Sequence, residues 1–216
     1  MTQKDKEPVP TPRRGRPRDP ERLRRILEAA RKHFYTHGLE RASVDAIAAE
    51  AGVSKMTIYS NFGSKEGLFG AVIQEGTDRV MGGDAGVEAL DPTQPRKALL
   101  AIGEQFLTLV RDEHTLGKMR SVYGVASSRP EACRAFYREG PERLTAELAA
   151  YLRRASDAGT LKVKTPRLAA DLFLAMFLGD GHFRGLLMLE KPDARENKAL
   201  LREAVQVFMA AYAAAD

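Results

Sequence analysis

The sequence predicts an all-α protein of nine to ten helices, and three observations lead to that fold class. Apolar residues recur at intervals of three and four through most of the 216 residues, which places them on one face of a helix. No segment alternates apolar and polar residues as a half-buried strand does. Asp-Pro, Thr-Pro and Ser before apolar runs, and Gly after them, are signals for helix starts and ends. A composition of 29% charged and 44% hydrophobic residues is that of a globular protein.

The first predicted elements are a basic arm and a helix. Residues 1–18 lack hydrophobic periodicity and are rich in Pro, Lys and Arg, so we expect this arm to be disordered. The first helix begins at Asp19 and Pro20, with Asp as N-cap and Pro at the first helical position. Its apolar residues follow at helical spacing, and we expect it to end at Gly38.

Residues 43–65 predict two short helices joined by a tight turn, followed by the start of another helix. Ser43 and Ser54 are placed to cap the two helices, and Gly52 can adopt the positive φ that the turn demands. Val44 and Ile47 on the first helix can pack against Ile58 on the second. That seam leaves polar side chains on the outer face of the second helix, which suits the DNA major groove. An ordinary αα-hairpin would share the caps and the seam, but not the polar outer face beside a basic arm.

The charge distribution favours DNA binding as well. Residues 1–66 contain 14 Lys and Arg against 9 Asp and Glu, whereas residues 67–216 contain 20 of each. The whole net charge of +5 therefore lies in the segment with the two short helices. Attraction to phosphates explains such an asymmetry, and a need for solubility alone would not localise it.

An ordered set of residues runs through the first third of the chain: 26–34 (ILEAARKHF), Gly38, Ser43, Val44, Ile47, Ala48, 51–55 (AGVSK), 57–59 (TIY), Phe62, Lys65, Glu66 and Leu68. Over residues 15–73 this set resembles the DNA-binding domain of the TetR/AcrR family of transcriptional regulators. The rest of the chain resembles that family only in length and helical character. The resemblance implies a helix-turn-helix domain at 19–66. A fourth helix then leads into a helical effector-binding and dimerisation domain at 67–216.

The predicted DNA contacts come from the recognition helix, its flanks and the arm. Lys55 is placed to donate to guanine, and Met56 either touches a thymine methyl or is unused surface. In the arm, Arg-Gly-Arg-Pro either lies in an A/T-rich minor groove, as an AT-hook does, or is a solvated basic tail. The resemblance adds base or phosphate contacts by Thr57 and Tyr59. We expect Asn61 and Lys65 to contact the DNA backbone, Lys65 from the positive end of the fourth helix, and Ser43 to donate to a phosphate. The full set is Arg14, Arg16, Arg18, Ser43, Lys55, Met56, Thr57, Tyr59, Asn61 and Lys65.

Beyond a Gly-rich loop at residues 82–95, five segments have helical periodicity. They cover residues 98–111, 114–126, 130–158, 166–190 and 193–214, and we expect Gly140 and Pro141 to kink or split the third. Residues 172–178 are apolar nearly all round, and the last segment carries a stripe at Leu201, Val205 and Phe208. We expect both to need a partner, and the family forms its dimer here. Asp171 and Asp180 make membrane insertion a poor alternative.

These observations predict a homodimeric, DNA-binding regulator, most simply a repressor that a small molecule releases from a palindromic operator. The alternatives are a nucleoid-type protein without an effector and, remotely, a helical enzyme. The four histidines are scattered and no catalytic motif occurs, so we expect no enzyme, cofactor or metal. One cysteine and no signal or membrane segment favour the cytoplasm. The residues predicted to line a ligand cavity, each of which could equally be core, are Phe106, Met119, Tyr123, Phe136, Tyr137, Met176, Phe177, Asp180, His182 and Phe183.

Overall fold

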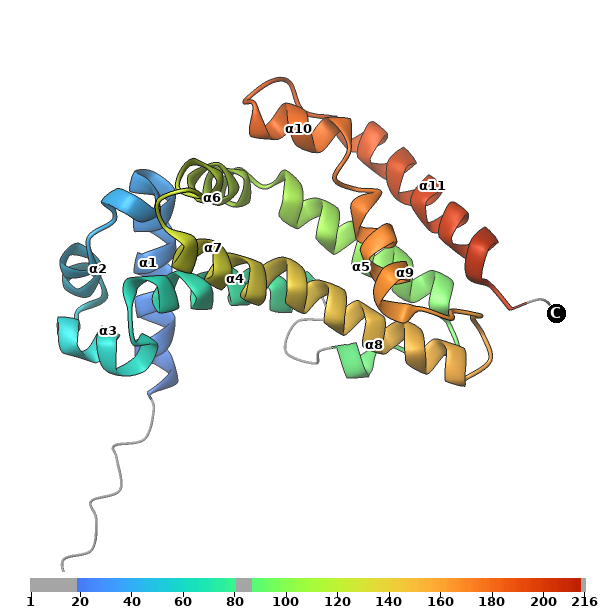
Figure 1. Ribbon diagram of the computed structural model, residues 1–216, viewed down its shortest axis with the longest axis horizontal. Coiled ribbons are helices and arrows are strands. Elements are labelled where there is room, and N and C mark those ends of the chain that lie inside the picture. The colour runs from blue at the N-terminus through green and yellow to red at the C-terminus, as the bar shows by residue number, and fades with distance from the viewer. Residues whose placement is uncertain (1–18, 81–86, 215–216) are drawn as a thin grey trace, which may run out of the picture.

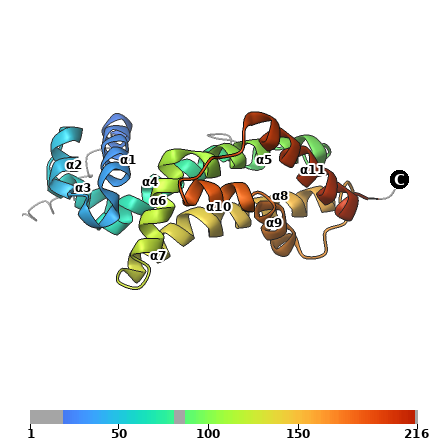
Figure 2. The same cartoon turned by 90° about the horizontal axis from the view of Figure 1, so that it is seen from above.

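The computed structural model describes residues 19–80 and 87–214, and both ranges are helical (Figure 1). Helices α1 (Pro20–Arg41), α2 (Val44–Ala51) and α3 (Lys55–Phe62) form a small bundle at one end of the molecule. Helix α4 (Lys65–Val80) runs from this bundle into a larger helical body, as the two views agree (Figures 1 and 2). The predicted arm at 1–18 and residues 81–86 of the predicted loop lie outside the described residues.

The larger body contains the remaining helices. After a short 3-10 turn, η2 (Val87–Ala89), come α5 (Pro95–Arg111), α6 (Glu113–Gly124), α7 (Pro130–Tyr137), the π-helical turn η3 (Arg138–Glu142), α8 (Arg143–Asp157), α9 (Pro166–Ala175), α10 (Asp180–Leu186) and α11 (Ala194–Tyr212). The segments α7, η3 and α8 form one continuous helix. The described ranges therefore contain ten separate helices, not counting the 3-10 turn η2. Only an isolated bridge pairs extended backbone there, between Leu161 and Ala213. The all-α prediction is confirmed.

Three of the predicted helices differ in detail from the observed ones. The first was expected to end at Gly38, but α1 extends to Arg41 across a local break at Gly38, whose φ is 70°. Gly140 and Pro141 do not split the middle helix; the chain passes them as a π turn, whose flanking residues keep right-handed helical φ and ψ. The predicted helix at 166–190 is instead broken after Ala175 and resumes at Asp180. Between these ends, the amides of Phe177 and Leu178 donate to carbonyls three residues earlier, as in tight turns rather than an α-helix.

One hydrophobic core joins α1, α2, α3 and α4. Phe34 on α1 and Phe69 on α4 pack edge to face with ring centroids 5.2 Å apart, a favourable arrangement of two aromatic rings. The same cluster includes Val122 of α6 and Ala132 of α7. The bundle of α1, α2 and α3 therefore packs directly on the larger body, and α4 is the helix that both parts share.

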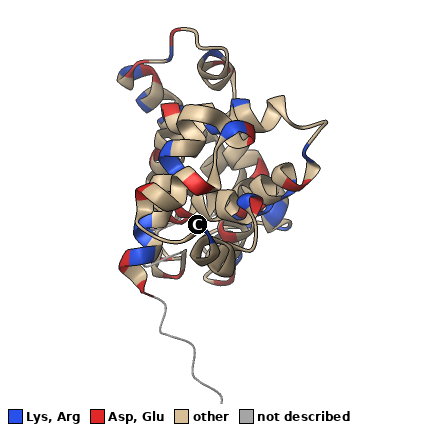
Figure 3. Ribbon diagram, turned by 90° about the vertical axis from the view of Figure 1, so that its left-hand side faces the viewer, with Lys and Arg blue, Asp and Glu red and all other residues tan. Residues whose placement is uncertain are grey.

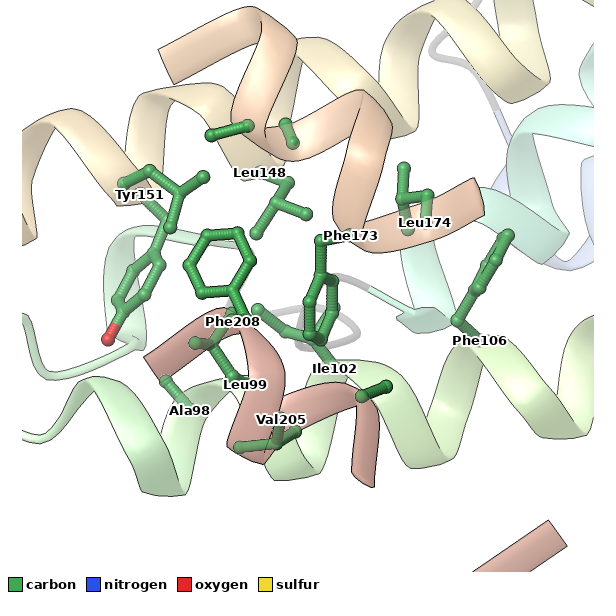
Figure 4. Packing of buried hydrophobic residues seen from close by; sticks show 14 of the residues in the cluster. Ala98, Leu99, Ile102, Phe106, Leu148, Tyr151, Phe173, Leu174, Val205 and Phe208 are labelled. Carbon is green, nitrogen blue, oxygen red and sulfur yellow. The ribbon is translucent and has the colours of Figure 1, made fainter. Parts of the chain in front are cut away.

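The second core lies among α5, α8, α9 and α11 (Figure 4). Phe208 of α11 is 2% exposed and packs edge to face on Phe173 of α9 at 5.2 Å between centroids. Gly103 lets α5 approach α11 closely, because a Cβ there would lie 2.6 Å from Cδ1 of Leu201. The expectation that this stripe needs a second subunit is therefore wrong for Val205 and Phe208, which helices of the same chain cover, whereas Leu201 is only half-buried.

No helix within residues 19–80 and 87–214 is both long enough and apolar enough to cross a bilayer.

Candidate functional sites

The geometry of α2 and α3 follows from local capping chemistry. The Ser43 hydroxyl accepts from the amide of Ala46 at 3.4 Å, and the Ser54 hydroxyl accepts from the amide of Thr57 at 3.2 Å. Gly52 ends α2 in the left-handed region at φ 66° and ψ 40°, where glycine has no steric penalty. Ile58 is fully buried, so it anchors α3 on the core and the opposite face of α3 meets solvent.

That outer face carries the residues predicted to contact DNA. Lys55, Met56 and Asn61 are exposed, and Thr57 and Tyr59 are half-buried. Some of their polar groups already have intramolecular partners. The Thr57 hydroxyl lies 2.9 Å from the Ser54 hydroxyl, and the Asn61 side-chain amide donates to the Thr57 carbonyl at 2.7 Å. Figure 3, which views the molecule from this end, shows Lys and Arg positions interspersed with Asp and Glu positions along the ribbon.

Lys55 has an acidic partner that periodicity did not reveal. Its Nζ donates to Oδ2 of Asp45, on α2, at 2.9 Å. The hydrogen bond to Asp45 raises the pKa of Lys55. The ammonium therefore stays charged, but in the free protein it forms an ion pair with the Asp45 carboxylate. The phosphates of DNA would repel that carboxylate.

Lys65 has a structural role that was not predicted. Its Nζ donates to the carbonyl oxygens of Glu40 and Ala42, both at 3.0 Å, where α1 ends and α2 is about to begin. Burial lowers its pKa. The expected contact of Lys65 with the DNA backbone would have to use the one ammonium N–H that does not donate to these two carbonyls. The predicted contacts Arg14, Arg16 and Arg18 lie outside the described residues.

An apolar cavity of about 160 Å³ lies in the larger body, between α4, α5, α6, α7, η3, α8 and α9. Three residues predicted to line a cavity, Phe106, Met119 and Phe136, do so. Much of the remaining wall is aliphatic, including Ile73, Leu109, Leu144 and Leu174.

The other seven residues predicted for the cavity lie elsewhere: Tyr123, Tyr137, Met176, Phe177, Asp180, His182 and Phe183. Tyr123, Tyr137 and Phe183 are more than half exposed, and Phe177 is fully buried in the core. The Asp180 carboxylate is exposed and pairs with Arg184 at 2.9 Å.

His182 is also a buried structural residue and does not line the cavity. It is 5% exposed, and its Nδ1 lies 3.2 Å from the carbonyl oxygen of Val110. Burial lowers its pKa. Helical spacing led to the prediction that Asp180 and His182 line the cavity. Spacing alone could not show that the helix breaks between α9 and α10 and turns both residues away from the cavity.

The polar residues in the cavity wall were missed by the sequence analysis. They are Thr77, Thr115, Lys118, Thr145 and Asp171. A signal was present for Lys118, because it lies one helical turn before Val122, on the apolar face of its helix. Lys118 is 7% exposed, whereas Asp171 is exposed.

The cavity adjoins the contact between α4 and η3. The Thr77 hydroxyl, on α4, donates to the Glu139 carbonyl of η3 at 2.8 Å. Next to it, Arg143 pairs with Asp78 at 2.6 Å. Gly140 and Pro141 of η3 line the same cavity, so anything that enlarged it would act on the attachment of α4. π-Helical turns are often found at functional sites.

Comparisons with known proteins agree with both parts of this architecture. Residues 26–72 match the family model described as bacterial regulatory proteins, tetR family. Residues 97–214 match the model of the C-terminal domain of AefR-like transcriptional repressors. The chain belongs to the TetR family.

Named relatives of this TetR-family chain include both a transcriptional repressor and a transcriptional activator. It is 46% identical over 59 residues to the transcriptional repressor SCO4008 of Streptomyces coelicolor, a match that covers 27% of this chain and 31% of that one. It is 38% identical over 112 residues to the transcriptional activator FasR of Mycolicibacterium smegmatis, over 50% of each chain. The chain thus spans half or less of these two curated relatives.

A solved structure covers more of the chain. A TetR-family transcriptional regulator from Mesorhizobium loti superposes with a TM-score of 0.70 at 27% identity. The match covers 92% of this chain and all of that one, so the likeness extends through the cavity-bearing body.

Proposed function

We propose that this TetR-family protein is a DNA-binding transcriptional regulator whose hold on DNA is relieved by a small molecule in the cavity. The observation that carries the proposal is α3, which is anchored by Ile58 and presents Lys55, Met56 and Asn61 outward. A helix of this kind reads base edges in the major groove. The division of the chain follows: residues 19–66 bind DNA, and residues 67–216 bind the effector and the second subunit.

Repression is the form of regulation that we propose, since the C-terminal family model is named for repressors and SCO4008 is a repressor. The named activator FasR keeps activation as the second candidate. The apolar cavity next to α4 favours a regulator with an effector over a nucleoid-type protein. Regulators of this family are generally not enzymes, and the site of action would be the cytoplasm, where the DNA is.

A homodimer on a palindromic operator is part of the proposal. Large apolar side chains that are at least half exposed lie on α9, α10 and α11, and in the segment after α10: Leu168, Leu172, Phe183, Leu187, Met188, Leu189 and Val207. A large exposed apolar surface marks an interaction site. A two-fold dimer would place its recognition helices on half-sites about 34–36 Å apart, or a multiple of that spacing.

Release of DNA depends on thermodynamic linkage between the effector cavity and the DNA-binding helices. The effector can shift the protein away from DNA only if it binds the DNA-incompetent state more tightly. The Thr77–Glu139 hydrogen bond and the Arg143–Asp78 pair attach α4 to the cavity wall. Because α4 also packs on α1 through Phe69 and Phe34, a displacement of the wall would reorient the DNA-binding bundle.

The test is selection of duplexes from a randomised pool with the full-length protein, followed by affinity measurements on the selected sequence. Lys55→Ala should weaken binding by about tenfold or more and relax the preference at one base pair of each half-site. Lys164→Ala, which removes an exposed lysine between α8 and α9, is the matched control and should change neither. Failure to select any sequence, or unchanged affinity and preference in Lys55→Ala, would overturn the proposal.

A further inference from the structure

The cavity limits the size of its occupant. Its volume is about 160 Å³, close to that of an engineered apolar cavity of about 150 Å³ that binds benzene. Phe106 and Phe136 contribute aromatic wall, and Leu109, Leu144 and Leu174 contribute aliphatic wall. A molecule with one six-membered ring fills such a space, whereas two fused rings exceed it unless the wall moves.

Three polar side chains of the wall already have partners within the chain. The Thr77 hydroxyl donates to the Glu139 carbonyl at 2.8 Å, and the Thr145 hydroxyl donates to the Pro141 carbonyl at 2.9 Å. Lys118 also has an interaction within the chain. None of these three groups therefore needs an occupant of the cavity to satisfy it.

Buried polar atoms without a partner lie elsewhere in the molecule. Among the described residues, buried side-chain nitrogen or oxygen atoms that lack a hydrogen-bond partner belong to Arg111, Arg154, Arg184 and Asn197, and none of these residues lines the cavity. A polar or charged group on the occupant would lose its hydrogen bonds to water on entering this wall, at a cost that no waiting partner offsets. An apolar occupant has no such cost and gains from the burial of its surface.

The cavity reaches the surface between η3 and α9. Pro141 of η3 and both Asp171 and Ala175 of α9 line it, and all three residues are exposed. Thr145 and Asp171 also line a shallow depression on the adjoining surface. A small molecule can therefore enter from solvent at this point without the hydrophobic cores coming apart.

From the size of the cavity and the pairing of its polar groups we propose that the effector is a neutral hydrocarbon of single-ring size, held by burial of its apolar surface. The inference rests on the proposed function, in which this cavity holds the effector. Such a site selects its ligand by volume and by the absence of polar groups, and not by a pattern of hydrogen bonds.

The experiment compares ligands that differ in polarity or in size. Toluene, phenol, benzoate and β-naphthol are each titrated into the full-length protein by calorimetry. Toluene should bind about tenfold more tightly than phenol, whose hydroxyl enters without a partner, and benzoate should bind most weakly. β-Naphthol should bind more weakly than phenol, although its second ring adds apolar surface, because that ring does not fit.

A substitution that fills the cavity tests where toluene binds. Gly76 of α4 lines the cavity, and a Cβ there would lie 3.4 Å from Cδ1 of Leu109, an ordinary contact. Gly76→Leu should therefore weaken toluene binding by about tenfold or more, because the new side chain and the ligand compete for one space. Gly124→Leu is the matched control, since a Cβ at the end of α6 would meet nothing within 4 Å, and it should bind toluene as the wild type does.

Several results would overturn the inference. These are equal or tighter binding of phenol or benzoate than of toluene, tighter binding of β-naphthol than of phenol, unchanged toluene binding in Gly76→Leu, or no toluene binding at millimolar concentration. If Gly76→Leu does not fold, as judged by circular dichroism, the ligand series on the wild type decides alone. Selective DNA binding without toluene binding refutes only this inference, whereas the absence of selective DNA binding refutes the proposed function.

Discussion

Replacing Phe208 by alanine tests whether the apolar stripe of α11 belongs to the core of one subunit or to the interface between two. Phe208 is 2% exposed within a single chain and packs on the rings of Phe173 and Tyr212 at 5.2 and 4.7 Å between centroids. Removing a buried Phe side chain leaves a cavity and costs about 3–5 kcal/mol of unfolding free energy. In a chain of this size, that lowers Tm by on the order of 10 °C.

The neighbouring residue supplies the matched control. Val207 is 50% exposed and points away from the core that buries Phe208, so Val207→Glu should change the stability of the subunit itself by no more than about 0.5 kcal/mol. If α11 contributes to the dimer, Val207→Glu should instead shift sedimentation at micromolar concentration toward the monomer.

Thermal and urea unfolding at several protein concentrations separates the two effects. The Phe208→Ala deficit should persist at every concentration, whereas an interface defect shrinks as concentration rises. Our reasoning would be refuted if Phe208→Ala unfolded within about 1 kcal/mol of the wild type and sedimented as a monomer. That result would return the stripe to the interface.

Two further substitutions test the DNA face and the link to the cavity. Asp45→Asn releases Lys55 from the 2.9 Å pair and should tighten DNA binding and steepen its salt dependence by up to about one unit of slope; unchanged or weaker binding in anisotropy titrations would contradict this. Thr77→Val removes the donor to Glu139 and should raise the effector concentration needed to release DNA more than it changes effector affinity, whereas Thr77→Ser should behave as wild type. Equal release by all three proteins would show that this hydrogen bond carries no coupling.

The DNA-binding end was largely predictable because its structure depends on neighbours in sequence. The caps at Ser43 and Ser54, the left-handed Gly52 and the buried Ile58 all occur as expected. Each depends on residues within one or two helical turns. Lys55 was placed correctly on the exposed face, but its partner Asp45 is on another helix, and only the crossing of α2 and α3 brings the two together.

The cavity was much less predictable. Aromatic residues in amphipathic helices were named as its lining, yet Tyr123 and Phe183 are exposed and Phe177 is core. Lys118 was not named, although it lies on the apolar face of α6 and lines the cavity. Periodicity identifies the face of a helix that is buried, but it does not say whether that face meets a neighbouring helix or an empty space.

The sequence by itself determined the fold class, most helix positions, the family resemblance and the exposed polar face of α3, because these follow from local spacing and capping. The tertiary structure decided what covers each apolar face. It placed Phe208 in the core and left Val207 exposed, although the two are adjacent in sequence. It also brought Lys118, Thr77 and Phe106 from three helices to one cavity. Such choices depend on how whole helices pack, and contacts between distant segments leave no regular pattern in a single sequence.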